Sequence, residues 1–393
     1  MIEDYDECSS GTGADTDGLV GALLPLAFDA EAEATAAPNT VPKKLYSKSL
    51  LVGARARFLA TTGDRDAGRE LLSNALRSGG WNYNRLWWEL VALIDSPEHY
   101  EEFRALWRDS PKVANSKPSL IRAAARAAGL AGAHDECRAL LRKNIIRNIG
   151  SAPPKKRVIT DDAGAFISDA SVALRDLYAA FGEHGTSLFL ISGTLLGLVR
   201  EGTIIGWDKD IDVGVFTEQC PADIAEKIDQ HPAFRIGRVD LTSDRLRLVH
   251  SNGVWIDVFP HYLEDGLRWH NGTVTRWWNS DFGLRETEFV GVSVMVPDDP
   301  ELYLDENYGD WRTPNSNFDA RIDAPNAEII DPEHFHSQLL FSLESSQRQG
   351  KHIMQARYTE LLRAAGEGSW LDRLDPAAER PAAERAVRFL LNR

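Results

Sequence analysis

The sequence predicts an α+β protein in which a domain with a mixed sheet is preceded and followed by helical regions. Apolar residues recur at helical spacing from residue 49 to about 150, and helical patterns dominate again over 333–393. Between them, over 151–332, short runs rich in branched and aromatic residues are typical of strands. With 393 residues, 43% of them apolar, the chain is long enough for two or three domains.

The chain carries 44 basic and 59 acidic side chains, a formal net charge of −15. We therefore expect no nucleic-acid partner, because a general attraction to phosphate needs the opposite charge. The three cysteines lie too far apart for a disulfide framework or a zinc site, which favours a reducing compartment. No apolar run reaches the roughly 20 residues of a membrane span and residues 1–4 do not begin a secretory signal, so we predict a cytoplasmic protein.

The first part of the chain divides into an acidic segment and a helical region. Residues 1–48 contain nine acidic residues, three lysines and many Gly, Ala and Thr, a composition that predicts a disordered tail. Over 49–150, similar tetrads beginning at Arg69, Arg104 and Arg138 recur at spacings of 35 and 34 residues. This period is typical of stacked helical hairpins, with an irregular bundle as the alternative. Such a domain would bind a protein partner or only support its neighbour.

The mixed-sheet domain follows a linker that two prolines, at 153 and 154, predict. Helices are expected over about 161–184 and near 221–230. The expected strands are 187–191, 211–216, 246–250, 255–262, 267–270 and 273–278. Asn271-Gly272, between the last two strands, predicts a two-residue hairpin turn. A helical C-terminal extension is expected over 333–393.

Three aspartates, Asp208, Asp210 and Asp212, alternate with Lys209 and Ile211. In an extended chain every second side chain faces the same way, so the three carboxylates would share one side. Such crowding is tolerated chiefly where a divalent cation neutralises it, and magnesium prefers hard oxygen ligands. The pattern therefore indicates a magnesium site, with an acidic surface turn or a calcium loop as the alternatives.

A further carboxylate, Asp257, lies inside an otherwise apolar expected strand. Burying this group is costly unless it is paired or binds a metal, which makes it a natural third ligand from a neighbouring strand. A hydrogen-bonded core aspartate is the alternative. Earlier in the chain, the expected strand 187–191 runs into Ser192-Gly193-Thr194 and an apolar helix. This arrangement puts free backbone N–H groups where a phosphate could sit.

Several blocks occur together, in order, in the mixed-sheet domain. They are Ser192-Gly193-Thr194-Leu195-Leu196-Gly197, Arg200, Trp207-Asp208-Lys209-Asp210-Ile211-Asp212, Ile256-Asp257-Val258-Phe259-Pro260, Val296-Pro297, Tyr303-Leu304 and Tyr308-Gly309-Asp310-Trp311-Arg312-Thr313-Pro314. This series resembles the LicD/fukutin family over roughly residues 160–320. The resemblance implies a nucleotidyltransferase-type fold and an enzyme that moves a phospho-alcohol from a CDP-linked donor to a glycan or glycopolymer.

The resemblance also implies roles for the aspartates. Asp210 and Asp212 would be the paired magnesium ligands, Asp257 the third metal ligand and Asp208 a supporting acid. The chain departs from the usual family pattern at Glu201, where histidine is common, and at Gly206, where proline is common. These departures affect the details of donor and acceptor binding rather than the metal carboxylates.

Positive groups and backbone amides are expected to hold the donor. Arg200 would pair with phosphate as a planar fork, because an anionic donor beside an acidic cluster needs additional positive charge; an arginine on a helix surface is the alternative. Arg245 and Arg247 alternate on an expected strand and are weaker candidates, with a solvated strand face as the alternative. The donor phosphates are expected to contact Ser192, Gly193 and Thr194.

The expected function is a phosphotransferase that depends on Mg²⁺, or on Mn²⁺ in its place, and acts in the synthesis of a cell-surface glycan or a teichoic-acid-like polymer. Its donor would be a CDP-activated alcohol carrying phosphocholine, ribitol phosphate or glycerol phosphate, and CMP would be released. A lipid-linked acceptor would place it at the inner face of the membrane. The alternatives are transfer of a nucleoside monophosphate from an NTP and a non-catalytic helical scaffold.

Overall fold

The computed structural model describes residues 45–61, 64–110, 117–149, 163–205, 210–239, 244–368 and 370–371. The chain forms two compact units, of which one comprises 1–157 together with 332–393 and the other comprises 158–331. The expected linker around 151–157 lies outside the described residues, as do nearly all of the expected acidic tail and Asp208. Among the described helices, none combines the length and the apolar character needed to cross a membrane.

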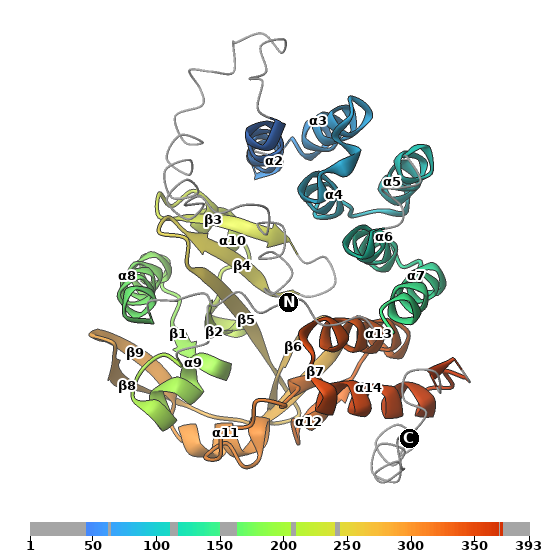
Figure 1. Cartoon of the computed structure of the whole chain (residues 1–393). Coiled ribbons are helices and arrows are strands. Elements are labelled where there is room, and N and C mark those ends of the chain that lie inside the picture. Colours follow the sequence, from blue (N-terminus) through green and yellow to red (C-terminus); the bar gives the residue numbers. More distant parts are fainter. Residues whose placement is uncertain are drawn as a thin grey trace. The chain divides into compact units, whose positions relative to one another are not determined.

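The first unit is helical (Figure 1). The Asp64 side chain accepts a hydrogen bond from the Ala67 amide and so caps the start of the second helix of this unit. The Ser96 side chain likewise accepts from the His99 amide and caps the helix that begins at Pro97. The three similar tetrads of the sequence fall on α3, α5 and α7. The helices before the second unit are α2 (Leu45–Thr61), α3 (Arg65–Arg77), α4 (Asn84–Val91), α5 (Pro97–Asp109), α6 (Pro118–Leu130) and α7 (His134–Arg147).

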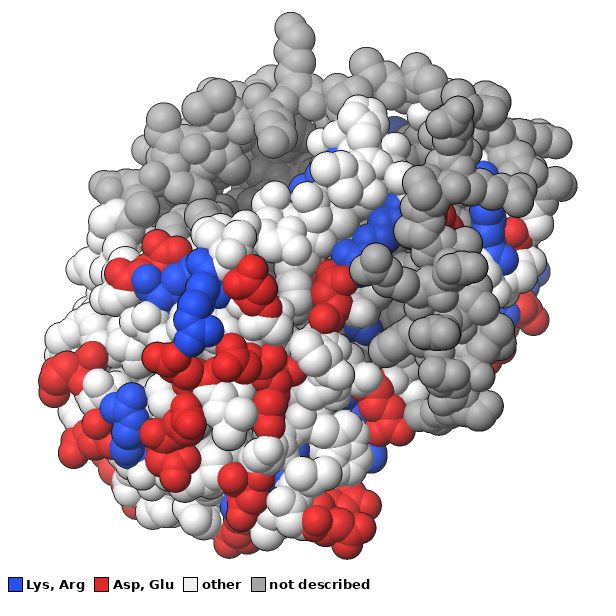
Figure 2. Space-filling view, turned by 90° about the horizontal axis from the view of Figure 1, so that it is seen from below, with Lys and Arg blue, Asp and Glu red and all other residues white. Residues whose placement is uncertain are grey.

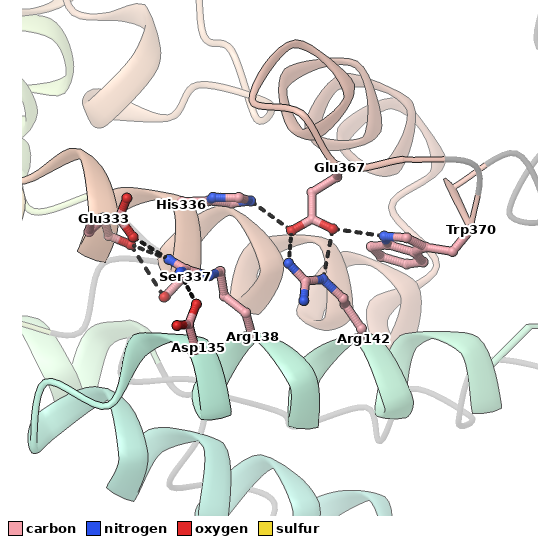
Figure 3. A network of polar contacts seen from close by, with 8 residues as sticks. All are labelled: Asp135, Arg138, Arg142, Glu333, His336, Ser337, Glu367 and Trp370. Atoms are coloured by element: carbon pink, nitrogen blue, oxygen red, sulfur yellow. Dashed lines mark hydrogen bonds and ion pairs between the residues drawn. The ribbon is translucent and has the colours of Figure 1, made fainter.

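Two helices from the end of the chain, α13 (Pro332–Gln349) and α14 (His352–Ala364), belong to the same unit, and α13 packs against α7. Glu344 on α13 is fully buried, where it pairs with Arg122 and accepts a hydrogen bond from Asn144 Nδ2 at 3.0 Å. A second network links α7 to this region through the carboxylate of Glu367, which binds Arg142 Nε at 2.7 Å (Figure 3). Because these charges are buried or half-buried, each needs its partner.

The second unit is built on a ten-stranded mixed sheet, which confirms the mixed sheet that the sequence predicts. Its main strand order is β10-β7-β6-β5-β2-β1-β9-β8, and β4 and β3 extend from β5. The pairs β2–β5 and β1–β9 are parallel and the other pairs are antiparallel. The strands are β1 (Leu188–Leu190), β2 (Asp210–Phe216), β3 (Phe234–Val239), β4 (Leu246–His250), β5 (Trp255–Glu264), β6 (Leu267–Asn271), β7 (Thr275–Ser280), β8 (Leu284–Phe289), β9 (Val292–Pro297) and β10 (Ala327–Ile329).

Helices of the second unit pack on this sheet. The long helix α8 buries Leu174, Leu177 and Phe181 in a core that also contains Phe189 from β1. A short helix, α9, follows β1 directly and continues into a π-helical turn over Gly197–Glu201. The described helices of this unit are α8 (Ala163–Gly182), α9 (Ser192–Leu196), α10 (Ile224–Asp229), α11 (Pro300–Tyr308) and α12 (Ala320–Asp323).

The hairpin β6–β7 differs from its predicted turn. Asn271 pairs with Arg276, residues 272–274 lie between the two strands, and the Gly272 amide donates to the Thr275 carbonyl at 2.8 Å. The prediction of a two-residue turn at Asn271-Gly272 is therefore wrong. The physical reason is burial, because Val274 and Thr275 are 2% and 0% exposed, and packing of these side chains outweighs the local preference of Asn-Gly.

Gly214 on β2 lies where a side chain does not fit. A Cβ atom there would lie 2.3 Å from Phe189 Cε2 and 2.8 Å from His261 Cε1. We expect Gly214→Ala to lower the free energy of unfolding by about 1–3 kcal/mol, because the buried rings must shift. Urea denaturation measures this change. Gly182→Ala is the matched control, since a Cβ there meets nothing within 4 Å; equal loss in both variants would contradict the prediction.

The buried histidines of β5 and β6 predict a pH-dependent stability. Burial lowers the pKa of His261 to about 4. As pH falls from about 6.5, the unfolded state takes up a proton that folded His261 does not, so stability is lost between pH 6.5 and about 4. Urea unfolding at pH 7 and at pH 4 measures how much stability is lost between the two pH values. We expect this loss to be about 3 kcal/mol smaller in His261→Gln than in the wild type. Half-buried His184→Gln should keep the wild-type dependence; an unchanged His261→Gln profile would count against the prediction.

Candidate functional site

Parallel pairing of β2 with β5 brings the predicted carboxylates together. Asp212 lies directly opposite Asp257 in this pairing, and Asp210 lies two residues earlier on the same face of β2. One carboxylate oxygen from each of the three lies within 4.8 Å of the other two. Asp257 is buried, whereas Asp210 and Asp212 are half-buried. The site is therefore a carboxylate cluster that opens on one side.

Two arginines join this cluster, Arg247 on the neighbouring strand β4 and Arg245 directly before that strand. Arg247 is in register with Asp257 and binds its carboxylate through Nε at 2.7 Å and Nη2 at 3.1 Å. Arg245 Nη1 donates to the same carboxylate at 3.0 Å. The sequence analysis ranked both arginines as weak candidates. Their alternation on an expected strand could be recognised in the sequence. The pairing of that strand with β5 could not.

Burial and charge act against each other at Asp257. Burial raises the pKa of this carboxyl above its ordinary value, the guanidinium groups of Arg245 and Arg247 oppose that rise, and the charge of Asp210 adds to it. Arg247 also reaches toward Asp210, with 3.9 Å between Nη2 and Oδ2. Three carboxylates and two guanidinium groups leave the cluster one negative charge in excess when all are ionised.

This donor set fits a magnesium ion. Carboxylate oxygens are the ligands that Mg²⁺ prefers, and bond lengths of about 2.0–2.1 Å require ligand oxygens no more than about 4.2 Å apart. Small side-chain movements would bring the three oxygens, now within 4.8 Å, to that spacing. Asp257 Oδ1 accepts one hydrogen bond, from Arg247 Nε, and keeps a second lone pair, whereas Oδ2 accepts from both Arg247 Nη2 and Arg245 Nη1. A divalent cation would change the excess charge from negative to positive, as an anionic phosphate substrate requires.

The Ser192-Gly193-Thr194 segment supports the cluster from α9. Thr194 is buried, and its Oγ1 accepts a hydrogen bond from the Asp212 amide at 2.9 Å. The Ile191 amide donates to the Asp212 carbonyl at 3.3 Å. Ser192 has a φ of 48°, a strained value for a residue with a side chain. These contacts make Thr194 a positioning residue for Asp212, while Ser192 and Gly193 are half-buried beside it.

Arg200 lies on the π-helical turn after α9 and contacts protein groups. Its Nη1 donates to the Trp311 carbonyl at 3.2 Å, and its Nε donates to Glu201 at 3.1 Å. The expected phosphate fork is therefore engaged with the segment that follows α11. Gly197, before Arg200, allows this turn to pack, because a Cβ there would lie 2.6 Å from the Thr203 carbonyl oxygen.

Sequence reasoning missed Tyr303, a buried tyrosine on α11. Its hydroxyl lies 3.5 Å from His261 Nε2. Burial raises the pKa of Tyr303 far above its ordinary value, and the charges of Tyr308 and Asp212 raise it further. Tyr303 is thus close enough to Asp212 for the two groups to interact. Its motif position was visible in the sequence, but its burial beside the carboxylates depends on where α11 packs.

The comparison with family models identifies the class of this domain. Residues 185–299 match the model described as "LicD/FKTN/FKRP, nucleotidyltransferase domain". The match includes α9, β2, β4 and β5, which carry the carboxylates and arginines described above. This part of the chain is therefore similar to the LicD/fukutin family.

Curated relatives match part of the chain. The mouse protein named ribitol-5-phosphate transferase FKTN is 31% identical over 179 residues, which cover 43% of this chain and 39% of the relative. The human ribitol 5-phosphate transferase FKRP is 25% identical over 138 residues, covering 32% of this chain and 28% of the relative. An uncharacterised protein of Caenorhabditis elegans is 40% identical over 96 residues, covering 23% and 24%. The chain thus spans less than half the length of these relatives.

Removing the charge of Asp257 should destabilise the second unit even without metal. We expect Asp257→Asn to lower the free energy of unfolding by about 3 kcal/mol in EDTA, because two arginines lose their buried partner. Asp210→Asn should cost less than about 1 kcal/mol, since Asp210 is more exposed and lies 3.9 Å from Arg247. Urea denaturation of both variants measures the difference. A neutral or stabilising Asp257→Asn would show that the ion pairs are not structural.

Proposed function

We propose that the chain transfers a phospho-alcohol from a CDP-linked donor to a glycan, releases CMP and depends on Mg²⁺ or Mn²⁺. The observation that carries the proposal is the carboxylate cluster of Asp210, Asp212 and Asp257, each offering an oxygen within 4.8 Å of the others. The similarity of this region to a family of nucleotidyltransferase domains supports it. The names of the two ribitol-phosphate transferases favour ribitol phosphate over phosphocholine and glycerol phosphate as the transferred group.

The proposed reaction is an in-line substitution at phosphorus. An acceptor hydroxyl oxygen forms a bond to the phosphorus that bears the alcohol. The bond from that phosphorus to the bridging oxygen breaks, and CMP leaves with the electron pair. The hydroxyl proton passes to a base, and the products are the phosphodiester and CMP. A bound magnesium ion would neutralise charge on the phosphate oxygens during this transfer.

The protein side chains would orient the metal ligands, accept the proton and attract the donor. Arg245 and Arg247 hold both oxygens of Asp257, which fixes the orientation of a ligand carboxylate as outer partners do in metal sites. The same contacts direct arginine N–H groups at both oxygens of Asp257, which leaves little room for this carboxylate to accept a proton from an acceptor hydroxyl. We therefore assign the proton to Asp212, whose backbone is positioned by Thr194. The net positive charge of the loaded cluster would attract the diphosphate of the donor.

Donor binding and turnover test the proposal on the full chain. Mg²⁺ or Mn²⁺ with CDP-ribitol should raise the melting temperature, equivalent to about 2.7 kcal/mol at a donor concentration of 100 times Kd. CMP release from CDP-ribitol, CDP-choline and CDP-glycerol is measured with a glycan acceptor. We expect Asp210→Asn to lower CMP release on the order of 100-fold, because charge stabilisation of several kcal/mol is lost.

Glu288→Gln is the matched control, because Glu288 is an exposed acid on β8 of the same unit and should keep wild-type activity. Release of pyrophosphate from an NTP, without CMP from any CDP-alcohol, would favour nucleoside monophosphate transfer instead. No metal-dependent binding of either donor class would contradict an enzymatic role. Full activity of Asp210→Asn would remove the carboxylate cluster from the mechanism.

A further inference from the structure

A cavity of about 380 Å³ lies in the second unit beyond the end of α11. That volume is within the range of about 300–1,000 Å³ typical of small-molecule sites. The family-model match ends at residue 299, before any residue of this cavity. The main lining residues are Tyr308, Asp310, Thr313, Asn315, Phe318 and Asp323.

Two aromatic rings form one wall of the cavity. The ring centroids of Tyr308 and Phe318 are 5.1 Å apart, with 36° between their planes, and both side chains are half-buried. The loop holds its shape through its own hydrogen bonds. The Phe318 amide donates to the Asn315 carbonyl at 3.2 Å, and the Asp319 amide donates to Asp323 Oδ2 at 2.8 Å. The aromatic wall is therefore formed before any ligand binds.

The rest of the lining can bind hydroxyl groups. Asp310 and Asp323 offer carboxylate oxygens, Asn315 an amide and Thr313 a hydroxyl. Among the residues that the structure describes, no lysine or arginine lines the cavity, although two carboxylates do. Figure 2 shows acidic side chains gathered in several groups on the face of the molecule that is lowest in Figure 1, where α11 lies. This charge disfavours a phosphate or a sugar acid and favours a neutral ligand rich in hydroxyl groups.

The cavity is connected to the carboxylate cluster through α11 and the segment after it. Tyr303, on α11, is close enough to interact electrostatically with both Tyr308 and Asp212. Arg200, which follows α9, binds the Trp311 carbonyl between Asp310 and Thr313. α11 also contacts α9, which positions Asp212. One continuous set of contacts therefore joins the aromatic wall to the candidate metal ligands.

We infer that this cavity binds a neutral sugar ring of the acceptor, which stacks its C–H face on Phe318 and Tyr308 and donates hydroxyl hydrogen bonds to Asp310 and Asp323. The acceptor role rests on the proposed function, whereas binding of a neutral sugar by the cavity does not. A sugar seated there would present the next unit of its glycan toward the cluster. The excess of acidic groups selects against acceptors that carry phosphate or carboxylate at this ring.

Saturation-transfer NMR on the full chain tests the binding directly. The probes are four neutral disaccharides (lactose, N-acetyllactosamine, chitobiose and maltose) and one glucuronic-acid-terminated disaccharide. We expect signal from at least one neutral probe and none from the acidic one. Phe318→Leu, which keeps apolar volume but loses the ring face, should weaken that binding about tenfold, equivalent to about 1.4 kcal/mol. Asp310→Asn should weaken it in the same direction, while Glu288→Gln should not.

A second measurement separates this inference from the proposed function. Phe318→Leu should slow transfer to a neutral glycan acceptor about tenfold at subsaturating acceptor, while hydrolysis of the CDP-alcohol by water stays at the wild-type rate. Failure of the wild-type chain to use any CDP-alcohol would defeat the proposed function but not neutral-sugar binding. Absence of binding by all four neutral probes, preference for the acidic one, or unchanged binding in Phe318→Leu with an unchanged melting temperature would overturn the inference.

Discussion

The candidate site depends on one backbone interaction, the parallel pairing of β2 with β5. This pairing sets Asp212 opposite Asp257, and the antiparallel pairing of β4 with β5 sets Arg247 on the other side of the same aspartate. A slip of one residue in either pairing would turn these side chains to the opposite face of the sheet. The chemistry of the cluster is thus determined by strand register before any side chain is positioned.

The arginines give Asp257 two roles in one structure. They satisfy a buried carboxylate that would otherwise be costly, and they leave its Oδ1 with a second lone pair that a cation can bind. Asp210 and Asp212 lack this degree of burial, so they can exchange water for ligands more easily. The cluster therefore combines a rigid ligand held by the sheet with two ligands that can adjust.

Local patterns in the sequence were sufficient for part of this structure. Alternation of Asp210 and Asp212 predicted a shared face, and the single acid in the apolar strand predicted a carboxylate from a neighbouring strand; both lie in the cluster. The strands 246–250 and 255–262 were also predicted close to their observed bounds. Asp208 lies outside the described residues, so its role stays a prediction.

The remaining features depend on contacts between distant segments. The strand pairing that joins Arg245 and Arg247 to Asp257 has no local signature, and neither has the burial of Tyr303 beside Asp212. The turn at Asn271-Gly272 failed because its strong local preference competes with burial of Val274. Strands β3, β8 and β10 were not predicted, since their sequences are short or mix charged with apolar residues; β9 was also missed, although its alternating valines are typical of a strand.

The helical unit is interrupted in the chain by the whole of the sheet unit. Its α7 ends at Arg147 and the helix that packs against it, α13, begins only at Pro332. During synthesis, Arg122 would leave the ribosome long before its buried partner Glu344. The helical unit consequently cannot complete its core until the sheet unit has been translated, and a chain that stopped at residue 331 would lack both α13 and the buried carboxylate that Arg122 binds.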